Sequence, residues 1–586
     1  MTKQTERKEI NLMNLELFPN EILFDLFDYF DGVDLFHTFY NLNSRFNFLL
    51  YQQYRFYSFN FNFISKRNFD LICKQHLSFV TNQILALRIS DNANFPRQVN
   101  LFISYMSSFS QFTHLQSLSL SYLHSYNILM KIIDECHQLG HLTHLYMKSC
   151  YFPKDQGDFL LIINKVWSLL KLTHCYFQIN IEEQEFFRIP TTISSSLQCL
   201  SVCGSVLKSY QINALIDHTI HLRYLSIPIE FDIYEGYKSS SFLIPTNLNI
   251  TITYLYNFEK LISFFRHTSN LCRLRITLSF NIIDGHQWEH IIRNYLPKLR
   301  VFRFNMSKRL RYDDNIKKQV DELIDSFSSS FWINDHQWFV RCFTQKNTVH
   351  LSTLSTTFNY YKDELLDIWK STYPNDVEQE FYDNLTTINK EFFFNQLIPS
   401  HIRLPNLRNL WIEFPINDRF WSIVPNLNHL YSLTIFSYIN SFQFQLQNFL
   451  DQIPHLNRLA IGPDNSLPLQ ISLFKCTNVS IRQLDLQNYV YGFNEEECII
   501  LCQSSLGIQC QVLFIQVRNP QSIIYLIKNM VNLQQLHVQC KFEKNCEHLP
   551  KIANGELIQW LKEQLPSTYS IVTHPSLANR FQIFIY

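Results

Sequence analysis

The side chains best suited to chemistry are histidines and cysteines gathered between positions 136 and 150. Imidazole and thiolate are zinc ligands, and the group comprises Cys136, His137, His141, His144 and Cys150. Their spacing matches no ordered set of four ligands, and Thr-His pairs recur at residues 113–114, 143–144 and 173–174. This recurrence favours a repeated stacking or surface position, so we expect no metal and no cofactor.

Covalent catalysis needs a nucleophile, a base and an orienting group in a recognisable turn, and no such set stands out. The chain has only 10 glycines, and no two lie close enough for a phosphate-binding loop, a dinucleotide fingerprint or a nucleophile elbow. Cys498 and Cys502 lie one helical turn apart after Glu495–Glu497, which indicates a helix with an acidic first turn and buried thiols. We therefore expect that the chain is not an enzyme.

Three arginines offer a different chemistry, because guanidinium groups bind carboxylates and phosphates. Arg273, Arg275 and Arg303 flank the apolar residues of two predicted strands, and Trp411 has the same kind of position farther along. Adjacent strands lie about 5 Å apart, so the arginines are expected to form one basic patch that binds an acidic or phosphorylated segment. Ordinary surface charge is the alternative.

The strands are predicted from an internal repeat, L-x-x-L-x-L with apolar substitutions, at intervals of roughly 25 residues. It begins at Leu115, Leu142, Leu172, Leu197, Leu222, Leu271, Leu299, Leu407, Leu430, Leu456, Ile481 and Leu533. A wider gap leaves room for a degenerate copy near Leu248. Apolar residues at helical spacing lie between the strands, as in Ile128–Cys136. Such strand–helix units bury their apolar faces by stacking into a curved solenoid.

Residues 80–300 and 400–545 therefore resemble the leucine-rich repeat family. The Asn or Cys that the family places after the strand is present only as Cys150 and Asn180. The resemblance thus implies an α/β fold made of irregular repeats backed by helices. Its open strand faces imply recognition of a substrate protein at Arg273, Arg275, Arg303 and Trp411.

Residues 15–50 have a separate character, with three short helices predicted from apolar spacing. Pro19 suits the first turn of the first helix, Gly32 is expected to break it, and Asp34 and Ser44 are expected to cap the next two. So short a module cannot bury all of its apolar side chains internally, and an exposed apolar face usually meets a partner.

This segment resembles an F-box. Phe18-Pro19-Asn20-Glu21-Ile22-Leu23 matches the opening of the family motif, and Leu26-Phe27, Tyr29-Phe30, Asp34-Leu35 and Arg45-Phe46 follow in order. The resemblance implies docking to the small adaptor of a cullin–RING ubiquitin ligase, with the repeats selecting the substrate. The implied adaptor contacts are Phe18, Pro19, Ile22, Leu23, Leu26, Phe27 and Leu35.

The expected organisation has five parts. They are a polar tail at 1–14, the F-box-like module at 15–60, a first repeat block at 61–305, an interruption or degenerate repeats at 306–400, and a second block at 401–586. Lys plus Arg equals Asp plus Glu at 50 each, which disfavours bulk binding to nucleic acid.

We also expect no membrane partner and a cytoplasmic or nuclear location, because no leader or long apolar stretch is evident. The alternative function is a scaffold without a ubiquitin role, in which the N-terminal helices only cap the solenoid.

Overall fold

The computed structural model describes most of the chain. The residues described are 15–53, 56–62, 64, 66–92, 97–153, 157–231, 245–310, 315–354, 365–389, 393–396, 398–416, 418–463, 471–487, 492–540, 554–566, 569–573 and 580–585. The predicted polar tail at 1–14 lies outside them. The chain forms two compact units: unit 1 comprises Met1–Cys342 and Thr348–Thr356, and unit 2 comprises Phe343–Asn347 and Thr357–Tyr586. The fold is mixed α/β.

Unit 1 is built on a sheet in which consecutive strands pair in parallel from β1 to β11. The sheet order is β1-β2-β3-β4-β5-β6-β8-β9-β10-β11-β13-β12-β14, with β7 paired to β8 beside this path, and β13 is antiparallel to β11. The strands are β1 (Tyr57–Asn60), β2 (Ile84–Ser90), β3 (Ser117–Ser121), β4 (His144–Phe152), β5 (His174–Ile181), β6 (Cys199–Cys203), β7 (Leu207–Lys208), β8 (Tyr224–Glu230), β9 (Asn247–Ile252), β10 (Arg273–Leu278), β11 (Val301–Arg309), β12 (Val340–Gln345) and β13 (Thr348–Thr353).

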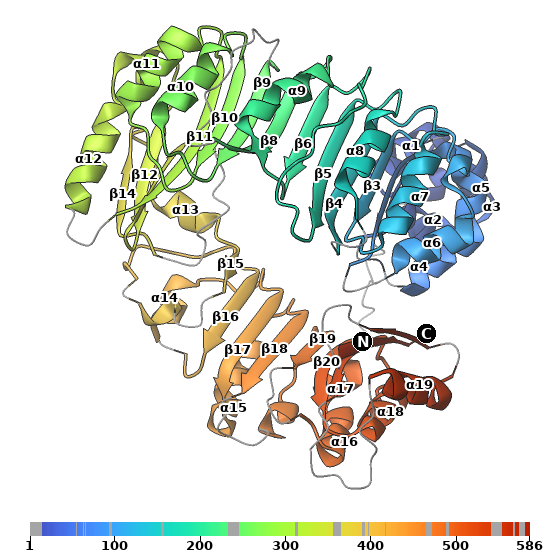
Figure 1. Ribbon diagram of the computed structural model, residues 1–586. Coiled ribbons are helices and arrows are strands. Elements are labelled where there is room, and N and C mark those ends of the chain that lie inside the picture. The colour runs from blue at the N-terminus through green and yellow to red at the C-terminus, as the bar shows by residue number, and fades with distance from the viewer. Residues whose placement is uncertain are drawn as a thin grey trace, which may run out of the picture. The chain divides into compact units, whose positions relative to one another are not determined.

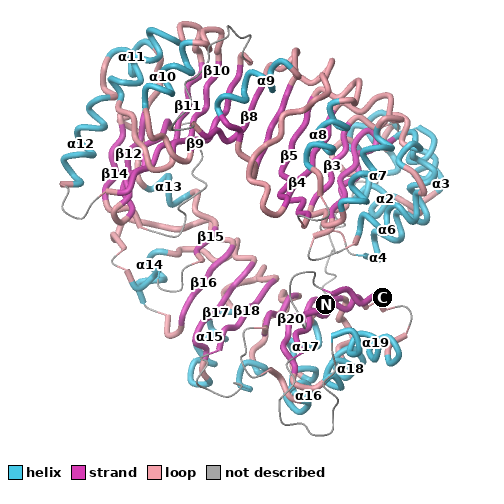
Figure 2. The backbone as a smooth tube through the Cα atoms, viewed as in Figure 1, coloured by secondary structure: helices cyan, strands magenta, loops and turns pink. Residues whose placement is uncertain are grey.

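Helices follow most of these strands and cover one face of the sheet, as Figure 1 shows for α7, α10 and α11. The helices of unit 1 are α1 (Asn20–Phe27), α2 (Gly32–Phe39), α3 (Ser44–Phe48), α4 (Lys66–Ile72), α5 (Ser78–Val80), α6 (Gln98–Met106), α7 (Tyr126–Cys136), α8 (Phe159–Trp167), α9 (Ile212–Asp217), α10 (Phe258–Arg266), α11 (Gly285–Tyr295) and α12 (Ile316–Ser326). The second face of the strands carries no such helical layer in the described residues (Figure 2), and we call it the open face.

Alternation along the strands explains this arrangement. Successive strand side chains point to opposite faces of a sheet, and in β10 Leu274 and Ile276 are buried while Arg273 and Arg275 are exposed. The buried positions align across neighbouring strands, so that Leu274 pairs with Leu248 on one side and with Phe302 on the other. These aligned apolar rows form the core under the helices. The degenerate copy predicted near Leu248 is confirmed as β9.

Unit 2 repeats the plan with a second sheet, of order β15-β16-β17-β18-β19-β20-β21-β23-β22. Pairing is parallel from β15 to β21, and β23 is antiparallel to both β21 and β22. The elements are β14 (Ile368–Ser371), α13 (Gln379–Asp383), β15 (Thr387–Ile388), β16 (Asn409–Glu413), α14 (Asp418–Ile423), β17 (Ser432–Tyr438), α15 (Gln443–Leu450), β18 (Arg458–Pro463), β19 (Gln483–Leu486), α16 (Glu495–Gln503), α17 (Ser505–Gln509), β20 (Val512–Val517), α18 (Pro520–Asn529), β21 (Gln535–Cys540), α19 (Asn554–Gln564), β22 (Ser570–Thr573) and β23 (Arg580–Phe584).

The N-terminal segment forms three short helices, but two of the predicted caps are wrong. Asp31 caps α2, because its carboxylate accepts a hydrogen bond from the backbone N–H of Asp34 at 2.9 Å. Asn43, not Ser44, caps α3. Gly32 begins α2 instead of only breaking the preceding helix. A Cβ at this position would lie 2.6 Å from the ring of Phe59, so close packing of α2 on β1 requires glycine.

Candidate functional site

Helix α1 carries apolar side chains on two different faces. Leu23 and Phe27 are fully buried, and the Phe27 ring packs against Phe39 of α2 with 5.0 Å between centroids. Ile22 is 48% exposed, and Tyr29, just past the helix end, is 88% exposed. Residues three and four apart share a face of a helix. The positions of Ile22, Leu26 and Tyr29 therefore form a continuous apolar stripe, which we call the outer stripe.

The outer stripe divides the seven adaptor contacts implied by the F-box resemblance. Ile22 lies on it with the half-buried Leu26, whereas Leu23, Phe27 and Leu35 are in the core. Core side chains cannot contact a partner without unfolding the module. Sequence reasoning missed Tyr29 as an exposed residue, although its spacing of seven residues from Ile22 predicts the shared helix face.

Phe18 and Pro19, the first two predicted contacts, lie in the turn before α1 and are held there by Arg45 of α3. The Arg45 guanidinium donates to the backbone oxygen of Phe18 at 2.6 Å and to Asn20 Oδ1 at 2.7 and 3.1 Å. It also donates to the backbone oxygen of Glu16 at 2.5 Å. Phe18 is half-buried and Pro19 is exposed. Arg45 thus orients the entry to α1, a role that its place in the sequence motif did not reveal.

The second helix of the module covers the first strand of the sheet. Phe36 of α2 stacks on Tyr57 and Phe59 of β1, with ring centroids 5.5 and 6.2 Å apart. It also stacks on His76 at 4.6 Å. Burial lowers the pKa of His76 to about 4, so this ring is neutral at pH 7. The module and the start of the sheet consequently share one aromatic core.

The three predicted arginines lie together on the open face of unit 1. Arg275 of β10 and Arg303 of β11 are direct partners in the parallel register, and Arg273 lies two residues before Arg275. All three side chains are exposed. Among the described residues, no carboxylate forms an ion pair with any of them. Like charges opposite each other destabilise a sheet, so this patch is electrostatically unfavourable by itself.

The two open-face rows that contain these arginines have no acidic residue. The row through Arg273 reads Ala86, Ser117, His144, His174, Cys199, Tyr224, Asn247, Arg273 and Val301, and the row through Arg275 reads Arg88, Ser119, Tyr146, Tyr176, Ser201, Ser226, Asn249, Arg275 and Arg303. Arg275 and Arg303 are flanked by Asn249, a neutral amide. These two rows therefore favour anionic over cationic ligands.

Trp411, the fourth predicted substrate contact, belongs to unit 2, whereas the three arginines belong to unit 1. It lies on the open face of β16 and packs on Phe436 of β17, with 5.2 Å between ring centroids. Farther along that face, Arg458 of β18 donates to the Asp485 carboxylate of β19 at 2.7 Å. Its guanidinium also lies 5.8 Å from the ring of Phe514.

His144 and the cysteines Cys498 and Cys502 occupy packed positions. His144 stacks on His174 at 4.2 Å, which confirms the stacking interpretation of the Thr-His repeat. Cys498 and Cys502 are buried in α16, as expected, and burial raises their pKa values to about 12 and about 11. A thiol that stays protonated at pH 7 is a poor nucleophile. The part of the chain that the structure describes holds no group of three or more potential metal ligands.

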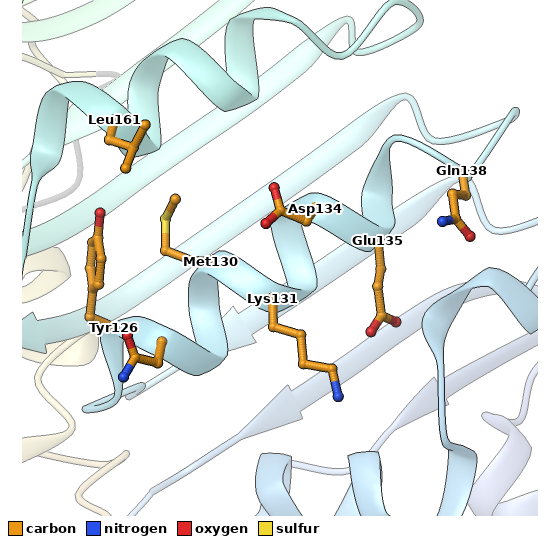
Figure 3. Close-up of a pocket in the computed structure, with 8 residues that line it drawn as sticks. Tyr126, Met130, Lys131, Asp134, Glu135, Gln138 and Leu161 are labelled. Carbon is orange, nitrogen blue, oxygen red and sulfur yellow. The ribbon is translucent and has the colours of Figure 1, made fainter.

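A shallow hollow lies over α7 and α8 (Figure 3). Its lining residues are Tyr126, Asn127, Met130, Lys131, Asp134, Glu135, Gln138 and Leu161. Both carboxylates in it already have partners: Asp134 forms an ion pair with Lys165, and Glu135 accepts hydrogen bonds from Ser108 Oγ and the backbone N–H of Phe109. The hollow thus offers neither a free acid nor a nucleophile–base pair.

Comparisons with family models and with curated proteins found no match to this chain. Within the described residues, no helix has the length and hydropathy needed to cross a bilayer.

Proposed function

We propose that this protein is a non-catalytic substrate receptor of a cullin–RING ubiquitin ligase. In this proposal residues 15–50 act as an F-box that docks the ligase adaptor, and the strand–helix array acts as an irregular leucine-rich-repeat solenoid that binds the substrate protein. The observation that carries the proposal is the outer stripe, where Ile22 and Tyr29 are exposed although Leu23 and Phe27 already supply the core.

The charge around the stripe also supports docking to another protein. Glu21, Asp25 and Asp28 are exposed and form a neighbouring stripe at helical spacing. Apolar side chains bordered by charged ones are typical of a protein interface with an apolar centre and a polar rim. The adaptor contacts proposed from this geometry are therefore Ile22, Leu26 and Tyr29, with Phe18 and Pro19 at the edge.

The test is co-purification of the full-length chain with purified cullin adaptor. The full chain is needed because a fragment of the first 65 residues would lack His76, on which Phe36 stacks, and β2 (Ile84–Ser90), with which β1 pairs. Ile22→Asp and Tyr29→Asp should each weaken adaptor binding at least tenfold, because they bury an unpaired charge in the interface.

Leu170→Asp is the matched control, since Leu170 is an exposed leucine far outside the module, and it should leave adaptor binding unchanged. Leu23→Asp is uninformative because Leu23 is buried. Failure of the wild-type chain to retain the adaptor, or equal retention by the wild type and both stripe variants, would reject the receptor proposal.

The second candidate is a scaffold in which the N-terminal helices only cap the array. The packing of Phe36 on Tyr57 and Phe59 favours it, because a cap must cover the first strand. A cap and a docking module differ at the outer stripe, which a cap does not use. Under the scaffold alternative, Ile22→Asp and Tyr29→Asp leave every interaction and the stability of the chain unchanged.

A further inference from the structure

Just after strands β9 and β10 lies a cluster of exposed aromatic side chains that the sequence did not single out. Tyr254 follows β9 and Phe280 follows β10, and their rings stack at 5.2 Å with an angle of 5° between planes. Tyr256 stacks on Tyr254 at 6.0 Å. The exposed fractions are 50% for Tyr254, 68% for Tyr256 and 54% for Phe280. These three large rings, with Tyr254 in contact with each of the other two and all three open to solvent, form the aromatic cluster.

The aromatic cluster is held in place before any ligand arrives. The Asn281 amide accepts a hydrogen bond from the backbone N–H of Leu255 at 3.2 Å and donates one to the backbone oxygen of Leu255 at 3.2 Å. This pair of bonds ties the two aromatic loops together. Phe280 has a φ of 67°, a left-handed conformation that is unfavourable for a bulky residue and that tends to persist where function needs it. Such preorganisation reduces the entropic cost of binding.

The arginine patch lies on β10 and β11, and the aromatic cluster follows the ends of the neighbouring strands β9 and β10. Arg275 and Phe280 are five residues apart on and just after β10, which corresponds to about 16 Å in extended chain. Exposed arginine and aromatic side chains are the types that dominate binding energy at protein interfaces. Because the open-face rows lack acidic residues, complementarity selects an anionic ligand.

We infer that strands β9–β11 bind an extended acidic protein segment, with carboxylates on Arg273, Arg275 and Arg303 and an aromatic or aliphatic anchor on Tyr254, Tyr256 and Phe280. The anchor lies about five residues from the acidic centre of the segment. This inference names the class of protein that the proposed receptor selects, and in that sense it rests on the proposed function.

A single-stranded nucleic acid fits this face less well. Base stacking needs free aromatic faces along a basic groove, but the aromatic rings of β4 and β5 are engaged with one another. His144 stacks on His174, and Lys148 lies 5.6 Å from the Tyr146 ring and 5.9 Å from the Tyr176 ring. We therefore favour a carboxylate-bearing peptide, and an oligonucleotide becomes an arm of the test.

The experiment uses the full chain and a fluorescein-labelled peptide, Glu-Asp-Glu-Gly-Ser-Gly-Ser-Trp-Leu, in fluorescence anisotropy titrations at several salt concentrations. R273Q/R275Q/R303Q should weaken binding at least tenfold and flatten its salt dependence. Y254S/Y256S/F280N should weaken binding about fivefold and retain the salt dependence. Asn is chosen at position 280 because it tolerates positive φ.

The matched controls are R67Q/R408Q and F79S/F444S, which remove exposed arginines and exposed aromatic rings elsewhere, and both should bind like the wild type. A peptide in which Gln replaces each acidic residue should lose as much affinity for the wild-type protein as the unchanged peptide loses for the arginine variant. A peptide in which Ser replaces Trp and Leu should lose as much affinity as the unchanged peptide loses for the aromatic variant. Circular dichroism of each variant checks that the fold is intact.

The inference is overturned by three results: no saturation below about 1 mM peptide, equal affinity for the wild type and both patch variants, or tighter binding of a twelve-nucleotide uridine RNA than of the peptide. Adaptor retention is measured on the same proteins. Loss of peptide binding with normal adaptor retention rejects only this inference, whereas loss of adaptor retention with normal peptide binding rejects only the receptor proposal.

Discussion

The open faces of the two units carry arginine at equivalent strand positions. The arginine of unit 2 has a carboxylate partner, whereas the arginine of unit 1 has a second arginine beside it. In unit 2, Asp485 lies one strand over and two residues beyond the register partner of Arg458, and the two form an ion pair at 2.7 Å. In unit 1 the same diagonal step from Arg273 reaches Arg303. One sheet position therefore carries a compensating carboxylate in unit 2 and a second cation in unit 1.

The two faces differ in whether the charge of the arginines is compensated within the protein. The guanidinium of Arg458 has a carboxylate partner and lies near the Phe514 ring, which stacks on His537 at 4.0 Å. Arg273, Arg275 and Arg303 have no such partner in the described chain. A carboxylate partner neutralises the charge of an arginine, whereas a cluster of arginines without such a partner produces a positive potential that attracts an anionic ligand. The basic patch of unit 1 is consequently the better candidate for recognition, although both units share one architecture.

The largest expected effect on stability comes from placing a second arginine beside Arg458 in unit 2, as Arg303 lies beside Arg273 in unit 1. Asp485→Arg removes the partner of Arg458 and adds a like charge beside it, and we expect a loss of about 2–3 kcal/mol in the free energy of unfolding. Partial exposure of Arg458 keeps the loss below that of a fully buried pair. Urea unfolding followed by circular dichroism measures it, with hydrogen exchange to localise the change to β18 and β19.

Asp485→Asn is the companion variant, which removes the negative charge without adding a positive one. Its loss in the free energy of unfolding should be smaller than that of Asp485→Arg. If Asp485→Arg and the wild type unfold at the same urea concentration, the ion pair between Arg458 and Asp485 does not stabilise the open face of unit 2.

The next effect concerns pH. Burial, and secondarily the charge of Arg458, lowers the pKa of His537 to about 3, against an ordinary value of 6.5. Above pH 6.5 the imidazole is neutral in both states. As the pH falls from 6.5 toward 3, the unfolded chain binds a proton that the folded chain does not, so stability decreases. At pH 5 the contribution of His537 is a loss of about 2 kcal/mol.

His537→Phe should remove that contribution while preserving the ring stack. The quantity to compare is the change in unfolding free energy between pH 7 and pH 5 in the wild type and in the variant. Identical changes would mean that His537 is not held neutral by its surroundings.

The smallest effect comes from the reverse exchange, in which unit 1 receives the arrangement of unit 2. Arg303→Asp gives Arg273 a diagonal carboxylate and removes a like charge beside Arg275. For exposed side chains we expect a gain of at most about 1 kcal/mol in stability, together with loss of acidic-peptide binding. Arg300→Asp, the same charge change in the exposed loop before β11, should produce neither result. Destabilisation by Arg303→Asp would contradict the repulsion argued for the wild-type patch.

The sequence alone predicted the strands that carry the repeat and the face that their side chains take, but not strands such as β2 and β20, which the repeat search did not find. Apolar alternation predicted β10 with Leu274 and Ile276 inside and Arg273 and Arg275 outside, and the repeat interval predicted β9 from a degenerate copy. Both follow from local chemistry, because the period of an extended chain is two and apolar side chains avoid water.

Only the tertiary structure decided which side chains meet. Ile22 and Leu23 are both apolar neighbours in one helix, and the packing of α1 on α2 alone makes one exposed and the other buried. Interstrand register likewise sets Arg458 beside Asp485 but Arg273 beside Arg303, and two loops far apart in sequence bring Tyr254 onto Phe280. Periodicity within a segment specifies a face, whereas contacts between segments depend on loop lengths and hydrogen-bond register, which no local pattern encodes.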